Sequence, residues 1–255
     1  MKNIQLSKRL QYVADFITPG LVLADIGTDH GFIPIYMVLA DKTPKAFAMD
    51  INEGPLERAT EHIEEKGLGD KIETRLSDGL QKLNGNEAEA VLIAGMGGAL
   101  VIKILDEGKH ALEGVKELVL SPHTEADLVR EYLKTTDFVI EKEGMVIDAG
   151  KYYVVIKARR REENEQGLLY VNENEAPEGV EEELYKTLCT KYGRILLEEK
   201  NIILKELLTK ELGTYNDIYE DIKYISSDIK VYMDTDKANY AIVKNISEDV
   251  KLITG

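Results

Sequence analysis

Acidic residues and glycines gather in four short turns of this 255-residue sequence, and chemistry is expected at these turns. The first turn, Asp25-Ile-Gly-Thr-Asp-His-Gly31, follows an apolar run and precedes a helical pattern. A glycine directly after a strand lets the backbone turn tightly and approach a ligand closely, and the next helix offers free N–H groups at its positive end. A pyrophosphate-binding loop has a further glycine in its middle, whereas this loop has Asp29 there. The extra carboxylate repels pyrophosphate and suits a ligand that carries positive charge.

The other three turns follow the next three predicted strands. Asp50 closes the second strand, 25 residues after Asp25, where an acid can accept both hydroxyls of a ribose. Asp78-Gly79 follows the third strand, where an aspartate can accept from an adenine amino group, and a glycine-rich turn from Ala94 follows the fourth. Any one of these aspartates alone is more often a solvated turn or a helix cap. Together they predict a site for S-adenosylmethionine (AdoMet), whose amino and sulfonium groups are cationic. The predicted cofactor-binding residues are Asp25, Gly27, His30, Gly31, Asp50, Ile51, Asp78, Gly79, Ala94, Gly95, Met96 and Gly97.

Short apolar runs alternate with amphipathic stretches between Leu21 and Ala158, which predicts a parallel sheet with helices on both faces. The last two runs are joined by Asp148-Ala149-Gly150, a turn-forming triplet, so they are expected to form an antiparallel hairpin. The fold class is therefore α/β, and the seven strands resemble the Rossmann-like sheet of AdoMet-dependent methyltransferases. The predicted strands are 21–26, 45–50, 72–76, 90–94, 117–120, 138–147 and 152–158, and the predicted helices are 35–40, 55–66, 100–107 and 126–135.

A second domain is predicted after a polar, acidic linker at residues 162–178. The catalytic domain then covers residues 1–161, and residues 179–255 form an α-helical coiled-coil hairpin. Its first helix, about residues 181–212, is expected to carry an apolar stripe that ends near Ile202, and a heptad pattern begins at Tyr215 and resumes at Val243. A structural or dimerisation role is the simpler interpretation of this hairpin. We expect a monomer, with a homodimer through the hairpin as the alternative.

Composition places the chain among soluble, cytoplasmic proteins. Hydrophobic residues make up 44% of it and charged residues 31%, and no apolar run approaches the ~18 residues that cross a bilayer. The single cysteine, Cys189, excludes an internal disulfide framework. None of the four histidines has a partner at metal-ligand spacing, so no metal is expected. The formal charge of −15 argues against a general binder of polyanions, although a local basic patch can still bind nucleic acid.

The catalytic domain resembles the bacterial tRNA (adenine-N1)-methyltransferases that modify adenine 22 in the D-loop, the TrmK family. The matching segments are Leu6-Ser-Lys-Arg-Leu10, Ala24-Asp-Ile-Gly-Thr-Asp-His-Gly31 with Pro34, Asp78-Gly79, and Ile93-Ala-Gly-Met-Gly-Gly-Ala-Leu100. Two positions depart from the family pattern. Ser121-Pro122-His123 stands where the family has Gln-Pro-Asn, and Asp50 stands where relatives often have glutamate. The C-terminal hairpin resembles the family only in architecture.

The resemblance implies transfer of a methyl group from AdoMet to N1 of a tRNA adenine. The product ring is cationic, so a carboxylate near the 6-amino group would stabilise it and later accept a proton. Asp29 is assigned this role as a hypothesis, and its alternative is an N-cap of the following helix. His30 either holds the AdoMet carboxylate or orients the base, and the simpler alternative is a local hydrogen-bond donor in the turn. His123 is the second catalytic candidate, as a donor to the target base. His62 and His110 are expected to be solvated.

The predicted tRNA contacts are Lys8, Arg9, Lys157, Arg159 and Arg160. The run Lys157–Arg160 has a simpler interpretation as a solvated strand end, and the family resemblance makes the two interpretations equal. Two other functions stay open at this point. One is a methyltransferase for a small molecule or a protein, and the other is a non-catalytic AdoMet-binding scaffold, for which the acids after three strands would not be needed.

Overall fold

The computed structural model describes residues 4–162, 186, 189–199 and 201–210. The chain divides into two compact units, Met1–Leu169 and Tyr170–Gly255. The predicted boundaries at residues 161 and 178 stay predictions. None of the helices in the described ranges is long and apolar enough to cross a membrane.

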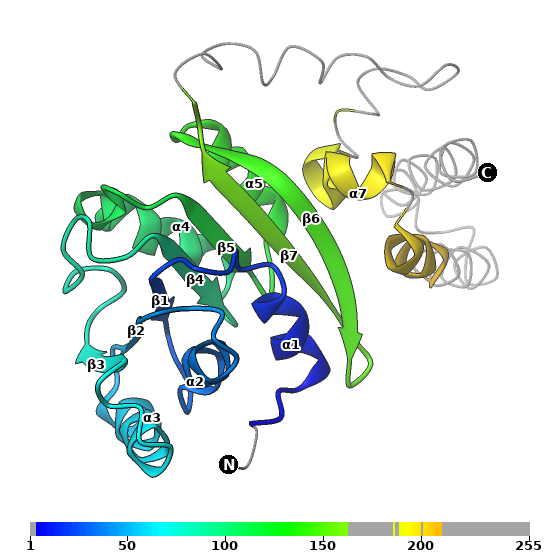
Figure 1. The fold of residues 1–255 in the computed structure, drawn as a ribbon. Helices are drawn as coiled ribbons and strands as arrows, with labels where there is room; N and C mark the ends of the chain where they lie inside the picture. The colour runs from blue at the N-terminus through cyan, green and yellow to red at the C-terminus, as the bar shows by residue number, and fades with distance from the viewer. Residues whose placement is uncertain (1–3, 163–185, 187–188, 200, 211–255) are drawn as a thin grey trace, which may run out of the picture. The chain divides into compact units, whose positions relative to one another are not determined.

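The first unit is built on a seven-stranded sheet in the order β3-β2-β1-β4-β5-β7-β6 (Figure 1). Strands β1 to β5 are parallel to one another, and β7 is antiparallel to both β5 and β6. The predicted fold class and the closing hairpin are therefore confirmed. The strands are β1 (Leu23–Ile26), β2 (Ala46–Asp50), β3 (Ile72–Leu76), β4 (Ala90–Ala94), β5 (Glu117–Ser121), β6 (Phe138–Asp148) and β7 (Lys151–Arg160).

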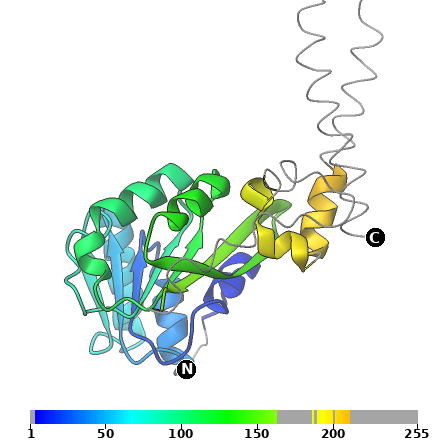
Figure 2. The same cartoon turned by 90° about the horizontal axis from the view of Figure 1, so that it is seen from above.

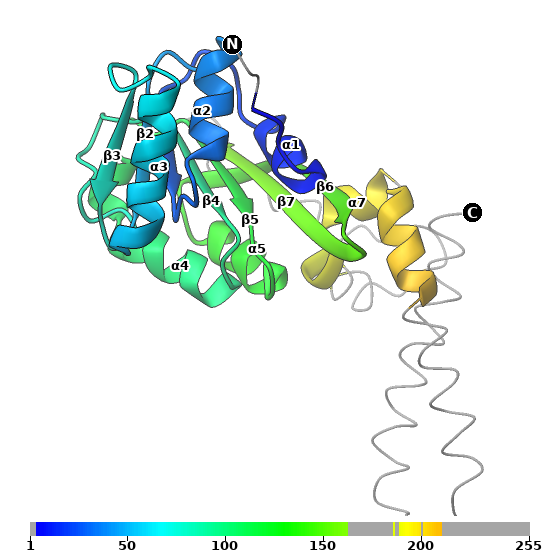
Figure 3. The same ribbon diagram turned by 90° about the horizontal axis from the view of Figure 1, so that it is seen from below.

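Helices cover both faces of this sheet. Seen from above, α4 and α5 lie on one side of the strands and α1 and α2 on the other (Figure 2). Figure 3 shows α2 and α3 on the same face. The helices are α1 (Lys8–Ala14), α2 (Phe32–Leu39), α3 (Glu53–Glu65), α4 (Gly98–Glu107) and α5 (Ala126–Lys134), with a 3₁₀ turn η1 at Lys109–Leu112.

Two apolar cores form because alternate residues of each strand point to opposite faces. In β4, Val91 and Ile93 join the core beneath α4 and α5, whereas Ala90 and Leu92 join the core beneath α1, α2 and α3. β1, β2 and β4 are buried along nearly their whole length. This burial explains why their sequences are continuous apolar runs rather than alternating ones.

The carboxyl ends of β1 to β5 define one edge of the sheet, called here the carboxyl edge, and their amino ends define the amino edge. Because β7 runs antiparallel to β5, Leu120 pairs with Ile156 and Glu117 pairs with Arg159. The end of β7 therefore lies at the amino edge, and its beginning lies at the carboxyl edge. The basic run Lys157–Arg160 is thus placed at the amino edge.

In the described part of the second unit, the expected long helix is interrupted at Gly193 and again before residue 202. Helix α7 (Arg194–Glu198) starts after Gly193, whose φ of 92° ends the preceding helical turns. A further helical stretch covers residues 202–210, and the side chain of Asn201 caps it by accepting from the backbone N–H groups of Ile203 and Leu204. The prediction of one continuous helix over 181–212 was wrong, and Ile202 is 80% exposed rather than part of a buried stripe. The heptads from Tyr215 onward lie outside the described residues.

Candidate active site

The four acidic or glycine-rich turns meet at the carboxyl edge. They follow β1, β2, β3 and β4, which are neighbours in the sheet. The strand order reverses between β1 and β4. Strands β2 and β3 are added on one side of β1, and β4 and β5 are added on its other side. Ligands of open α/β sheets bind at this reversal point, outside the carboxyl ends of the strands.

The turn after β1 is fixed by hydrogen bonds of its backbone and of Asp25. Gly27 has a φ of +74°, and its N–H and that of Thr28 both donate to the carbonyl of Met49, at 2.8 and 2.9 Å. Asp25 is 7% exposed and accepts a hydrogen bond from the Thr28 hydroxyl at 2.7 Å. Burial raises the pKa of Asp25 to about 7; the Thr28 hydrogen bond opposes this shift and the nearby Asp50 adds to it. A buried carboxyl with this pKa is stabilised in its charged form by a cationic ligand.

Asp29 lies at the mouth of the same turn, with a 68% exposed side chain. Its carboxylate pairs with Arg58 of α3 at 3.2 Å and lies 3.4 Å from the ring of His30. The N-cap of α2 is Gly31, and no side chain makes a cap hydrogen bond there. The structure therefore does not support the alternative role of Asp29 as the N-cap of α2.

His30 has a φ of 62°, and its ring stacks on Phe32 and His62 with centroids 5.0 and 5.3 Å away. Nδ1 of His30 is buried without a hydrogen-bond partner among the described residues. His62 is partly buried, and its Nδ1 bonds the carbonyl of His30 at 3.0 Å. The expectation that His62 is simply solvated was wrong, because it supports the turn that carries Asp29.

The turns after β2 and β3 offer an acid and an apolar surface. Asp50 accepts hydrogen bonds from the backbone and side-chain nitrogens of Asn52, which fixes its carboxylate at the start of α3. Ile51 is 58% exposed beside Asp50 and is the apolar surface of this turn. Asp78 is exposed, and Gly79 follows it with a φ of 54°. A side chain on Gly79 would press against Ile104 of α4 at 3.0 Å, so this turn packs closely.

The turn after β4 faces the turn after β1. Met96 lies so close to Gly27 that any side chain at position 27 would collide with it. Gly95 has a φ of +88°, and Gly97 forms a bridge with Thr124. Ala94, Gly95 and Met96 are all at least partly exposed at the edge. The structure thus brings together all four turns that the sequence singles out. Their roles in cofactor binding stay predictions.

Arg9, His123 and Tyr153 form a cluster beside Gly95 that the sequence did not predict. Nη1 of Arg9 lies 2.6 Å from Nε2 of His123, and the Arg9 guanidinium lies 5.1 Å from the centre of the Tyr153 ring. The backbone N–H of Arg9 also donates to Asp148 at 3.0 Å. Burial lowers the pKa of His123, and Arg9 and Lys151 lower it further. Arg9 thus contacts a catalytic candidate, while the neighbouring Lys8 is exposed at the start of α1.

The basic run at the end of β7 makes structural contacts at the amino edge. Lys157 is 15% exposed and pairs with Glu117 at 3.1 Å and with Glu141 at 3.7 Å. Arg160 donates to the carbonyls of Val115 and Leu112. The side chain of Arg159 donates to the carbonyl of Arg160 at 3.3 Å. These contacts favour the interpretation of the run as a strand end, and its tRNA contact stays a prediction.

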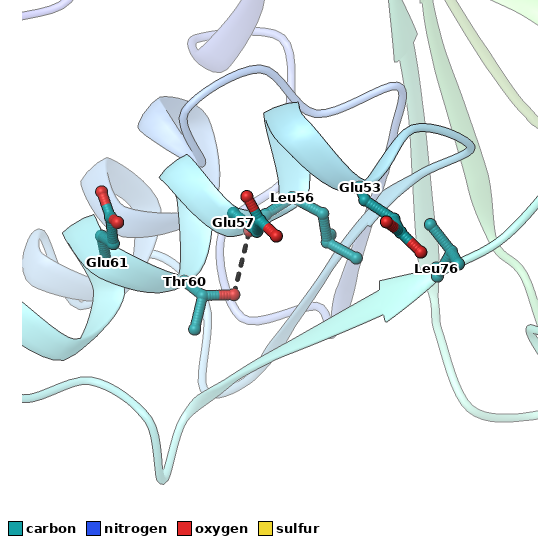
Figure 4. A pocket seen from close by; sticks show the side chains of 6 residues that line it. All are labelled: Glu53, Leu56, Glu57, Thr60, Glu61 and Leu76. Carbon is teal, nitrogen blue, oxygen red and sulfur yellow. Dashed lines mark hydrogen bonds between the residues drawn. The ribbon is translucent and has the colours of Figure 1, made fainter.

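A shallow hollow of about 360 Å³ lies between α3 and the end of β3 (Figure 4). It is lined by Glu53, Leu56, Glu57, Thr60, Glu61 and Leu76. Thr60 uses its hydroxyl to bond the carbonyl of Leu56, so the hollow is bordered mainly by carboxylates and leucines. Three carboxylates on one helix face repel phosphate, which makes this flank unsuited to RNA. Within the described ranges no group of three His, Cys, Asp or Glu side chains could hold a metal ion.

The sheet order, with its antiparallel β7 inserted before β6, and the acidic turns at the carboxyl edge define the class of Rossmann-like methyltransferases. The family model of the methyltransferase domain matches residues 6–156. More specifically, the chain belongs to the family of the tRNA (adenine(22)-N(1))-methyltransferases. The Bacillus subtilis enzyme of that name is 37% identical over 222 residues, which is 87% of each chain.

Two solved structures of this family are similar over almost the whole chain. The crystal structure of the B. subtilis m1A22 tRNA methyltransferase TrmK is 32% identical, with a TM-score of 0.74, and covers 99% of this chain and 100% of its own. The structure of M. capricolum TrmK in complex with S-adenosyl-homocysteine is 26% identical, with a TM-score of 0.72, and covers 97% and 99%.

Proposed function

We propose that this chain transfers the methyl group of AdoMet to N1 of adenine 22 in the D-loop of tRNA. The observation that carries the proposal is the convergence of Asp25, Asp50 and Asp78 with two glycine turns at one sheet edge, in a chain that belongs to the m1A22 methyltransferase family. The B. subtilis relative is named a tRNA (adenine(22)-N(1))-methyltransferase. The M. capricolum TrmK structure is a complex with S-adenosyl-homocysteine, the natural cofactor product.

The residues at the carboxyl edge fit AdoMet. The positive φ angles of Gly27 and Gly95 keep side chains away from the space in front of the edge. Nδ1 of His30 is buried and unpaired within the described structure, so it can bond a polar group of the cofactor. Exposed Ile51 offers an apolar surface beside Asp50. We assign Asp25 to the cationic methionine part, Asp50 to the ribose hydroxyls and Asp78 to the adenine amino group.

AdoMet supplies a methyl group on a sulfonium, which is already a good leaving group. The protein's contribution is therefore to position the adenine and to stabilise charge. N1 of adenine attacks with a lone pair in the plane of the base, and the ring becomes positively charged. The exposed carboxylate of Asp29, held by Arg58, stabilises this charge and accepts a proton from the 6-amino group. An adenine in folded tRNA must first be flipped or unstacked to reach the edge.

The charges around the carboxyl edge favour approach of tRNA from the side of α1 and the β6–β7 turn. Lys8, Arg9 and Lys151 lie there, whereas Glu53, Glu57 and Glu61 lie on the α3 flank. Phosphate contacts release counterions, so tRNA affinity should fall steeply with salt. Affinity that does not change with salt would contradict this route of approach. We further propose that the protein acts as a monomer in the cytoplasm, where its tRNA substrate is found.

Methyl transfer from labelled AdoMet to unmodified tRNA transcripts tests the proposal. We expect N1-methyladenosine in the D-loop when the product nucleoside is mapped by mass spectrometry. AdoMet binding without any transfer to tRNA would overturn the substrate assignment and retain the cofactor. Failure to bind AdoMet at all would overturn both.

A further inference from the structure

The contact between Arg9 and His123 fixes the protonation of the histidine ring. Nη1 of Arg9 and Nε2 of His123 are 2.6 Å apart, although the residues are 114 positions apart in the sequence. A guanidinium has five N–H donors and no acceptor. Nε2 must therefore be the acceptor and carry no hydrogen. A neutral imidazole has one N–H, so the hydrogen of His123 is on Nδ1.

The charged groups around the ring favour the same neutral state. Arg9 from α1 and Lys151 from the start of β7 both disfavour a second positive charge on His123. Asp148 accepts from the backbone N–H of Arg9, and Glu125 accepts from the backbone N–H of Ala99. Among the described residues no carboxylate pairs with the His123 ring. The Arg9 guanidinium is also held from its other side, because it lies over the ring of Tyr153.

The His123 ring lies beside the carboxyl edge, and its Nδ1–H is not used by any other described residue. A side chain on Gly95 would lie 3.8 Å from Nε2 and 3.9 Å from Cε1 of the ring, so His123 borders the turn after β4. The residue is exposed, and Nδ1 has no bond to any other described residue. The contact with Arg9 therefore leaves one function for the ring. It can donate from Nδ1, and it cannot accept a proton at Nε2 unless Arg9 moves away.

We propose that Arg9 is a positioning residue that holds His123 as a neutral hydrogen-bond donor, and that Nδ1–H of His123 binds a ring nitrogen of the target adenine. This inference rests on the proposed function. Adenine has acceptors at N3 and N7 that stay free while N1 reacts. The two catalytic candidates then differ in role. Asp29 accepts the proton from the 6-amino group, whereas His123 orients the base without accepting that proton.

A double-mutant cycle separates this role from a simple contact of Arg9 with tRNA phosphate. Arg9→Met keeps the aliphatic stem and the backbone bond to Asp148 but removes the donors. His123→Asn keeps a donor that needs no tautomer. We expect Arg9→Met to lower kcat by about 10- to 100-fold in the wild-type background and by less than about 3-fold in the His123→Asn background. His123→Asn alone should stay within about 5-fold of wild type.

The matched control is Lys103→Ala, which removes an exposed cation on α4 that pairs only loosely with Glu107 at 4.0 Å. It should change kcat in neither background. Equal losses from Arg9→Met in both backgrounds would overturn the inference, because Arg9 would then act without His123. An inactive His123→Asn variant with an unchanged melting temperature would also overturn it.

The pH profile and the ring tautomer give a readout that a purely structural role would not move. With Arg9→Met the acid limb of kcat should shift to higher pH. His123 then loses a neighbouring cation and gains a proton more readily, and the resulting cationic ring opposes the positive charge that develops on the methylated adenine. In ¹⁵N-histidine NMR spectra of the wild-type protein, the signal that His123→Asn removes should be that of an Nδ1–H tautomer. An Nε2–H tautomer or a charged ring at pH 7.5 would overturn the inference. This NMR result does not need tRNA methylation, so failure of the proposed function is recognised separately.

Discussion

The charged side chains at the two edges of the sheet differ in how completely they are paired. At the amino edge, buried Glu117 accepts from the backbone and hydroxyl of Thr18 and pairs with Lys157, so its charge is fully compensated. At the carboxyl edge, Asp25 is buried with one hydroxyl donor, and Nδ1 of His30 has no described partner. Polar groups left incompletely bonded cost stability. Their concentration at one edge indicates that this edge is shaped for ligands and the other for folding.

The largest expected effect concerns the uncompensated charge of Asp25. Its pKa is about 7 in the folded protein against an ordinary 3.8. Above pH 3.8 the unfolded chain releases this proton while the folded chain keeps it, so folding stability falls as pH rises and the loss is complete above about pH 7. The contribution is on the order of 4 kcal/mol. Urea unfolding at pH 4.5 and pH 8 should show Asp25→Asn gaining stability over wild type as pH rises. A pH-independent difference would contradict the comparison.

The second prediction concerns catalysis at the carboxyl edge. Asp29→Ala should lower turnover by about 10²- to 10³-fold while changing AdoMet affinity much less, because its carboxylate acts on the target base. Single-turnover rates and equilibrium AdoMet titrations measure the two effects. Arg58→Ala is the control, since it removes the ion-pair partner and leaves the carboxylate. Equal losses of turnover and AdoMet affinity in Asp29→Ala would make Asp29 a cofactor residue instead.

At the amino edge the effect should be on stability alone. Lys157→Met removes the cation beside buried Glu117 and should lower the free energy of unfolding by about 2–3 kcal/mol. The KM for tRNA and its salt dependence should stay unchanged. If the basic run binds phosphate instead, KM rises and the slope of log affinity against log salt falls by about one. Chemical denaturation and steady-state kinetics on the same preparation distinguish the two.

The smallest effects are expected at two glycines with similar positive φ angles. Gly20 and Gly95 have φ angles of +94° and +88°, and an added side chain meets no atom within 4 Å at Gly20 but meets Arg9 and His123 at 3.7 and 3.8 Å at Gly95. Alanine at either position should lower stability by about 1–2 kcal/mol. Only Gly95→Ala should also lower methyl transfer per folded molecule. Equal activities of the two variants would remove Gly95 from the site.

The sheet was predictable because buried parallel strands leave a strong local signal. β3 and β4 begin and end as expected, and the other strands differ by a few residues at their ends. Helix α2 starts three residues earlier than expected, because Gly31 in a left-handed conformation begins it without a side-chain cap. Two local sequence signals mark the break in the second unit. Gly193 and the capping residue Asn201 both interrupt the expected helix.

The candidate site was predictable only where it consists of turns after strands. The sequence placed the four turns at one edge because parallel strands share their carboxyl ends. The contact of Arg9 with His123 and Tyr153 depends on how α1 packs beside the hairpin, and no local pattern encodes it. The position of Lys157–Arg160 was implied by the predicted hairpin itself. The last strand of an antiparallel pair must end at the amino edge, away from the turns.

The most direct test of the central claim compares two tRNA transcripts that differ only at position 22. Both are incubated with labelled AdoMet and enzyme under single-turnover conditions. The transcript with adenine 22 should be methylated at N1 of that nucleotide, and the transcript with guanine 22 should take up no label. Equal labelling of the two transcripts, or methylation of another nucleotide in the first, would contradict the account.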